Sequence, residues 1–233
     1  MTTSPSADFT LALPNDDLSL DLGSGPDPAP GFVGVDLITR PRGADGAGGV
    51  LYADLFSGEP WPFESGSCRR LRAWHVIEHI PRHSVVIGET AVRRTIRTPG
   101  APRRVVVDTL PIKTDAFFWF FSEAFRVAAP GCRFELAWPH PQSDGADQDP
   151  THHRRIPVSM LHYLSTDGRR ALHVTHYPVD CNWLVQAESV FELGSAEQLA
   201  RFTGDDGVVD IARAKQCHNV FDEIRAVLVK PLE

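Results

Sequence analysis

The sequence predicts an α/β domain with a mostly parallel β-sheet, because short apolar runs alternate with turns and helix-like segments from residue 17 onward. Such alternation is typical of parallel sheets with crossover connections. The chain has 233 residues, 42% of them in the hydrophobic set, which is enough for one large domain with its own core. We expect a single domain over residues 17–233 and a loose polar tail over residues 1–16.

The individual elements are expected where the apolar pattern changes along the chain. One helix is expected over residues 113–127, where Pro130-Gly131 follows its end, and a second over residues 209–221. Residues 41–49 and 194–206 are expected to be connections. Strands, as runs of apolar and β-branched side chains, are expected at residues 18–22, 32–37, 50–54, 71–75, 134–138 and 224–229.

A basic insertion interrupts this alternation at about residues 83–112. Its β-branched runs, 85–87 and 104–107, flank a Pro99-Gly100 turn signal, so we expect a β-hairpin-like arm. Between Arg82 and Lys113 there are seven basic and two acidic residues, a balance of +5 in a chain of net charge −7. The arm is interpreted as a surface excursion, a lid or a dimer contact, and these alternatives stay open.

Composition excludes several classes of protein. No run of 18 apolar residues occurs, so no membrane span is expected, and residues 1–10 do not resemble a secretory signal. The cysteines Cys68, Cys132, Cys181 and Cys217 are isolated from one another, which indicates reduced thiols and a cytoplasmic location. The net charge of −7 disfavours nucleic acid as a partner, although the basic arm keeps an anionic partner open.

A glycine turn follows the first expected strand, in the string Asp21-Leu22-Gly23-Ser24-Gly25. Glycines there let a ligand approach the backbone closely. Three prolines within residues 26–30 exclude the helix that holds a pyrophosphate in dinucleotide folds. Asp36 comes eleven residues after Gly25. In dinucleotide-binding folds the corresponding acid comes about twenty residues after the glycine motif. The pattern therefore favours a nucleoside ligand without a pyrophosphate, and S-adenosylmethionine (SAM) is such a ligand.

Several strings, taken in order, resemble class I SAM-dependent methyltransferases of the seven-stranded Rossmann-like kind, with a core similar to methyltransferase type 11. The resemblance covers residues 17–80 and 113–165. It implies a Rossmann-like sheet flanked by helices and SAM as the cofactor. The strings that carry it are LDLGSGPDPAPGFVGVDL, ADLFSGEPWPFESGS, AWHVIEHIP, SEAFRVAAPGCRFELAWP and QDPTHHRRIP.

The predicted cofactor residues lie in the first three of these strings. The glycine turn and Asp21 are expected to receive the amino-acid tail of SAM, and Asp36 to accept its ribose hydroxyls, since a carboxylate offers two acceptor oxygens. The resemblance implies that Asp54 and Leu55 hold the adenine. The full predicted set is Asp21, Gly23, Gly25, Asp36, Leu37, Asp54, Leu55 and His75.

The predicted catalytic residues are His152, His75 and His79. His75, Glu78 and His79 follow the strand at residues 71–75, at the carboxyl edge where open α/β sheets bind ligands. His75 is expected to line the cofactor pocket and His79 to face the acceptor. His152 is expected to be the base or the group that orients the acceptor, because methyl transfer needs alignment and, for a protonated acceptor, a base. The alternative is that these histidines cap or pack helix and loop ends.

The predicted substrate-binding residues follow the strand at residues 134–138; they are His140, His153, Arg154 and Tyr163. A metal site made from His140, Asp149, His152 and His153 is a rival interpretation, since these are ligand types for zinc or iron. Adjacent histidines rarely point the same way, and the loop has no HxH or HxxxH spacing. We therefore expect no metal.

Five consecutive aromatic residues, Phe117 to Phe121, cover every face of the first expected helix. One face enters the core, and the surplus favours a second packing partner. Packing under the 83–112 arm, or a homodimer contact through this helix and the arm, is expected. The less favoured alternative is an aromatic wall of the substrate site.

These observations predict an enzyme that transfers a methyl group from SAM to a small-molecule acceptor, as in specialised metabolism. The alternatives are a non-catalytic scaffold that binds SAM or another nucleoside and, less favoured, a metal-assisted or NAD-dependent enzyme.

Overall fold

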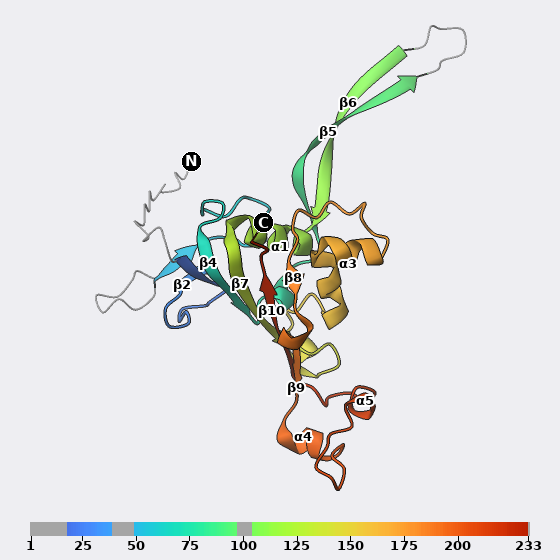
Figure 1. Ribbon diagram of the computed structural model, residues 1–233. Coiled ribbons are helices and arrows are strands. Elements are labelled where there is room, and N and C mark those ends of the chain that lie inside the picture. The colour runs from blue at the N-terminus through green and yellow to red at the C-terminus, as the bar shows by residue number, and fades with distance from the viewer. Residues whose placement is uncertain (1–17, 39–48, 97–103, 233) are drawn as a thin grey trace.

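Figure 1 shows the computed structural model, which describes residues 18–38, 49–96 and 104–232. The predicted tail at residues 1–16, nearly all of the predicted loop at 41–49 and the Pro99-Gly100 turn lie outside the described residues. No helix among the described residues is long and apolar enough to cross a membrane.

The domain is built on a mixed, mostly parallel sheet flanked by helices, which confirms the predicted fold class. Its path is β3-β2-β1-β4-β7-β10-β8, and β9 pairs additionally with β10. β1 is parallel to β2 and β4, and β4 is parallel to β7, whereas β10 is antiparallel to β7. The strands are β1 Leu18–Leu22, β2 Val33–Asp36, β3 Val50–Tyr52, β4 Cys68–Trp74, β7 Ala128–Pro139, β8 Leu184–Val185, β9 Phe191–Leu193 and β10 Glu223–Val229.

The strand order reverses at β1, because the chain moves outward from β1 to β2 and β3 and then returns to β4 on the other side of β1. In open α/β sheets, ligands bind beside the carboxyl ends of the strands at such a switch point. The proline-rich connection between β1 and β2 contains no helix, as the sequence predicts. No helix therefore covers the backbone at the end of β1 in this connection.

The helices differ from the expectations at several ends. The predicted helix at 113–127 begins at residue 116, because the residues up to Asp115 continue a strand; the Asp115 carboxylate accepts the Phe117 N–H at 2.8 Å as an N-cap. Pro130-Gly131 lies inside β7 rather than in a loop. The helices are α1 Ala116–Val127, α2 Gly145–Gln148, α3 Thr166–Ala171, α4 Ala196–Ala200 and α5 Ile211–Ala214, with 3-10 turns η1 Ile77–His79, η2 Val158–Leu164 and η3 Ala187–Ser189.

The predicted helix at residues 209–221 is wrong, since only the four residues of α5 are helical. Asn219 has a left-handed φ of 60°, and its side chain bonds Asp144, while its N–H donates to the Gln142 carbonyl at 2.8 Å. These contacts to a distant segment end the helix early. The predicted connection at 194–206 contains α4, which begins with a capping box between Ser195 and Gln198.

The predicted arm is a long two-stranded hairpin made of β5 Ser84–Ile96 and β6 Arg104–Asp115, paired antiparallel. It projects away from the sheet, opposite the segment that carries α4 and α5 (Figure 1). Its base is fixed to the domain, because Val85 is buried in the core. Further out, large apolar side chains are exposed: Val86, Ile87, Val105, Val107 and Leu110.

The aromatic helix α1 finds its packing partners within the same chain. Phe117, Phe120 and Phe121 are buried in the core, where Phe121 lies 5.9 Å from Phe134 of β7 between ring centroids. On the other side, the Trp183 indole N–H donates to the Phe121 carbonyl at 3.1 Å. The surplus aromatic surface is thus largely covered by the chain's own C-terminal half.

Candidate functional site

A cavity of about 320 Å³ opens at the carboxyl edge of the sheet, beside the switch point. Its volume lies at the lower end of the roughly 300–1,000 Å³ typical of ligand sites. All the predicted cofactor residues except Asp21 line it, and so does His79. The lining residues are Gly23, Gly25, Asp36, Leu37, Ala53, Asp54, Leu55, Phe56, His75, Val76 and His79.

The glycine turn forms one wall of this cavity. Gly23 has φ of +67°, and its N–H donates to the Val35 carbonyl at 2.7 Å. A Cβ on Gly23 would lie 2.5 Å from a Val76 methyl group, whereas a Cβ on Gly25 would meet nothing within 4 Å. Gly23 is therefore required for close packing against the chain after β4, while Gly25, with φ of +60°, faces open space.

Asp36 ties the end of β2 to the glycine turn. One carboxylate oxygen accepts the Gly25 N–H at 2.7 Å, and the other accepts the Leu37 N–H at 2.6 Å. A carboxylate offers about four lone-pair sites, so each oxygen can accept a further hydrogen bond. The turn and the acid thus lie together beside the cavity, in the arrangement that the spacing of the sequence predicts.

Asp21 lies behind this wall rather than in it. Its carboxylate is buried, accepts the Ala29 N–H at 2.9 Å and pairs with the Arg72 guanidinium at 2.6 Å. Burial raises the pKa of Asp21, and the Ala29 and Arg72 contacts oppose that rise. The carboxylate is occupied by donors of its own chain, so its predicted contact with a ligand ammonium group stays a prediction.

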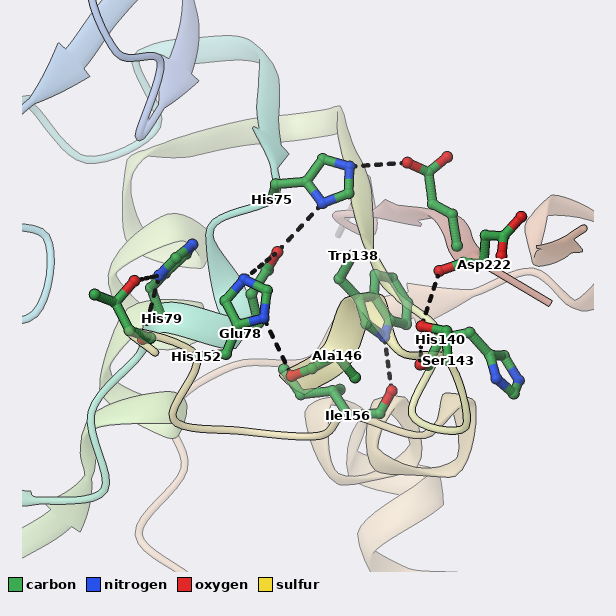
Figure 2. Close-up of polar contacts among 12 residues, drawn as sticks. His75, Glu78, His79, Trp138, His140, Ser143, Ala146, His152, Ile156 and Asp222 are labelled. Carbon is green, nitrogen blue, oxygen red and sulfur yellow. Dashed lines mark hydrogen bonds and ion pairs between the residues drawn. The ribbon is translucent and has the colours of Figure 1, made fainter. Parts of the chain in front are cut away.

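His75 directly follows β4 and lines the opposite wall of the cavity. Figure 2 shows its ring next to Glu78. Its backbone has a left-handed φ of 53°, and its ring bridges two carboxylates. Nδ1 lies 3.3 Å from Glu78 Oε1, and Nε2 lies 2.9 Å from Glu223 Oε2. The contact with the Glu78 carboxylate raises the pKa of His75 most, burial opposes this rise, and the contact with Glu223 adds to it, so the imidazolium form is favoured.

Glu78 is the buried centre of this wall. Its side chain is 2% exposed, and among the described residues neither carboxylate oxygen has a partner in hydrogen-bond geometry. The contact with His75 is within ion-pair distance only, and His152 Nε2 lies 4.0 Å from the same oxygen. The Glu78 carbonyl accepts the N–H groups of His153 and Arg154, which fixes η1 against the loop after β7.

His79 and His152 lie together, 4.7 Å apart between ring centroids. Thr151 Oγ1 donates to Asp149 Oδ1 at 2.7 Å, so at the 3.0 Å contact with His79 Nδ1 it accepts. His152 Nδ1 lies 3.1 Å from the Ala146 carbonyl, which can only accept. Both rings therefore carry a proton on Nδ1, and their Nε2 atoms keep a lone pair when the rings are neutral.

The four predicted substrate residues lie apart from this cavity. His140 is buried, its Nε2 lies 3.6 Å from Glu192, and burial lowers its pKa. His153 is exposed, and Tyr163 packs near the rings of Phe118 and Tyr177. Their substrate contacts stay predictions.

Arg154 lines a second cavity of about 420 Å³ at the base of the arm. Its guanidinium bonds the carbonyls of Ile80 and Pro81 and the carboxylate of Asp115. These contacts connect the loop after β7 with the base of the arm and the start of α1. The structure therefore gives Arg154 a connecting position, and its contact with an anionic acceptor stays a prediction.

Sequence reasoning assigned no role to Glu78 and overlooked Thr151. Glu78 stands between His75 and His79 in the string AWHVIEHIP, so its position was visible, but its burial was not. Thr151 takes its role from contacts with His79, 72 residues away. No local pattern in the sequence predicts that contact.

Comparison with known proteins gives matches among solved structures. No family model and no curated protein matches the sequence. Solved structures that match include a SAM-dependent methyltransferase from Archaeoglobus fulgidus, with 12% identity, a TM-score of 0.49 and coverage of 92% of this chain and 86% of that chain. Another, from Mesorhizobium loti, has 12% identity, a TM-score of 0.45 and 94% coverage of both chains.

A third match is a Haemonchus contortus phosphoethanolamine N-methyltransferase 2, with 13% identity and a TM-score of 0.49, covering 93% of this chain and 49% of that chain. The Rossmann-like arrangement rests on the structure itself, in which β1 lies between the parallel strands β2 and β4. The glycine turn and the acid at the end of β2 line a cavity of about 320 Å³ beside this switch point.

Proposed function

We propose that this chain is a methyltransferase that uses SAM to methylate a small-molecule acceptor. One observation carries the proposal: the glycine turn, Asp36 and the end of β3 share a single cavity with His75 and His79. A nucleoside ligand held by the glycine turn and Asp36 would therefore have its reactive end beside the side chains of His75 and His79. That is the proximity on which methyl transfer depends.

The residues of the first wall fit the cofactor. Gly25 leaves open space beside an exposed turn, so a ligand can approach its backbone. Asp36 can still accept hydrogen bonds from ribose hydroxyls. Leu55 and Phe56 supply apolar surface for the adenine ring beside Asp54. The cofactor would supply an electrophilic methyl group.

The residues of the second wall fit an acceptor. His75, held between Glu78 and Glu223, supplies a ring in a fixed position, and His79 supplies a ring whose orientation Thr151 sets. His152 stands against His79 but is not among the cavity-lining residues. We therefore place His79 nearest the acceptor. We propose that His152, next to His79, acts as the base or as the group that orients the acceptor.

The test is calorimetric titration of the full chain with S-adenosylhomocysteine, SAM and NAD, followed by incubation with labelled SAM and a metabolite extract. Binding of both adenosyl compounds, no binding of NAD and label transfer to an extract component are expected. Binding of NAD alone would overturn the cofactor assignment. Tight SAM binding with no transfer to any acceptor would instead favour a nucleoside-binding scaffold.

We also propose that the arm joins two copies of the chain. Val105 and Val107 are more than half exposed on neighbouring same-face positions of β6, and exposed apolar surface of this kind marks interaction sites. Light scattering should show a dimer that the double substitution Val105→Lys and Val107→Lys converts to monomer. Val208→Lys, at an equally exposed position outside the arm, should leave the dimer intact; a wild-type monomer would contradict the proposal.

A further inference from the structure

A group of three potential metal ligands lies beside the second wall of the cavity: Glu78, His79 and His152. One ligand atom from each lies within 4.8 Å of the others. We propose that these three side chains bind a divalent transition-metal ion at the acceptor end of the cavity. Its place in catalysis rests on the proposed methyl transfer, whereas its binding does not.

The two histidines are already oriented as ligands. Each uses its Nδ1–H on a partner of its own chain, Thr151 for His79 and the Ala146 carbonyl for His152, so each Nε2 lone pair is left for an ion. Metal-ligating histidines almost always donate their other ring N–H in this manner. For His79 the chain continues through Thr151 to the exposed carboxylate of Asp149.

The third ligand is a buried carboxylate that lacks hydrogen-bond partners. Glu78 is almost completely buried, and neither of its oxygens has a hydrogen-bond partner among the described residues. An unpaired carboxylate is costly to bury, and the neighbouring His75 reaches only one oxygen, at 3.3 Å. A cation between Glu78 and the two Nε2 atoms would satisfy the carboxylate.

The donor set indicates the kind of ion. Two imidazoles and one carboxylate, with further positions open, suit zinc or ferrous iron. Ligand atoms on a tetrahedral zinc ion lie about 3.5 Å apart for bonds of about 2.1 Å. The ion would therefore draw these atoms together by at most about 1.3 Å from the 4.8 Å limit, which needs rotation of the side chains.

An ion held by these side chains would lie beside the cavity, because His79 also lines it. This favours an acceptor with a hydroxyl or enol oxygen, whose proton a bound ion makes easier to remove. The proton leaves to water, and the oxygen forms a bond to the methyl carbon. The bond from that carbon to the sulfonium sulfur breaks, and its electron pair stays on sulfur, leaving a neutral thioether.

The experiment measures metal binding directly, on the full chain stripped with chelator. Titration with Zn²⁺ should show one site, and Co²⁺ should give a visible absorption spectrum that Zn²⁺ abolishes. His152→Ala and Glu78→Gln should each weaken Zn²⁺ binding at least 100-fold. His162→Ala, an exposed histidine in η2, is the matched control and should bind as the wild type does. No Zn²⁺ site, or equal binding by all variants, would overturn the proposal.

A second variant tests the site with a smaller change, because His152→Ala or Glu78→Gln could fail to fold. Thr151→Val changes an exposed side chain and removes its hydroxyl contacts with His79 and Asp149, while the Thr151 carbonyl stays 3.3 Å from His79 Nδ1. Metal affinity should therefore fall about 10-fold, the lower end for loss of such a contact. Unchanged affinity in this variant, with normal circular dichroism, would overturn the assignment of His79. S-adenosylhomocysteine titration separates the two proposals: Zn²⁺ binding without nucleoside binding rejects the methyltransferase alone, and the reverse rejects the metal site alone.

Discussion

The two walls of the cavity are built in different ways. The wall at the glycine turn comes from short segments at the ends of β1, β2 and β3. Its contacts are made by backbone N–H groups, such as the one that Gly25 donates to the Asp36 carboxylate. The wall at His75, Glu78 and His79 depends on side chains from β10 and from the loop after β7. The first wall is therefore specified locally, and the second only by tertiary packing.

The largest expected effect concerns the buried pair behind the first wall. Arg72→Ala leaves Asp21 buried without its cation, and breaking such a pair costs about 3–5 kcal/mol of stability. Arg70 lies on the same strand and reaches Glu135 at 3.8 Å with both side chains partly exposed, so Arg70→Ala should cost about 0–1 kcal/mol. Urea unfolding of both variants measures the difference; equal losses would mean that Asp21 is not held by Arg72.

The second prediction compares the two glycines of the turn. Gly23→Ala places a methyl group against Val76, which adds about 1–3 kcal/mol of overpacking to the left-handed backbone strain. Gly25→Ala carries the backbone strain alone, about 1–2 kcal/mol. Thermal and urea unfolding should therefore rank Gly23→Ala as the less stable. A Gly25→Ala variant of equal or lower stability would contradict the packing described for the turn.

These two predictions rest on features that sequence reasoning reached in part. Strand positions, the missing helix between β1 and β2 and the meeting of Gly25 with Asp36 all follow from local spacing. The helix expected over residues 209–221 was wrong, because Asn219 bonds Asp144 across 75 residues. The role of Glu78 was invisible for the same reason: burial and facing partners are set by segments far apart in the chain.

The third prediction tests the first wall as a ligand site. Asp36→Ala should weaken S-adenosylhomocysteine binding by about 1–3 kcal/mol, or about 5- to 150-fold, the scale for losing hydrogen bonds to a charged group. Asp167→Ala, at an almost fully exposed residue that pairs with Arg170, is the control and should bind normally. Calorimetric titration measures both, and unchanged affinity in Asp36→Ala would remove Asp36 from the ligand site.

The smallest expected effect is on the pH dependence of the unfolding free energy, and it concerns His140, which lies apart from the second wall. Burial lowers the pKa of His140, so the folded state holds it neutral, and its contribution to stability is present above the ordinary pKa of about 6.5. That contribution is lost as the pH falls through the lowered pKa, because unfolding then takes up a proton. One such group adds at most about 1.4 kcal/mol per pH unit to the slope of the unfolding free energy.

His140→Gln should therefore flatten this slope between pH 7 and 5, since glutamine can still accept the Gln142 N–H that His140 Nδ1 accepts at 3.2 Å but does not titrate. Urea unfolding at closely spaced pH values measures the slope for the wild type and the variant. The exposed His162→Ala serves as the control and should keep the wild-type slope. If His140→Gln also keeps it, the pKa of His140 is not lowered in the folded state, and its contact with Glu192 at 3.6 Å offsets the effect of its burial.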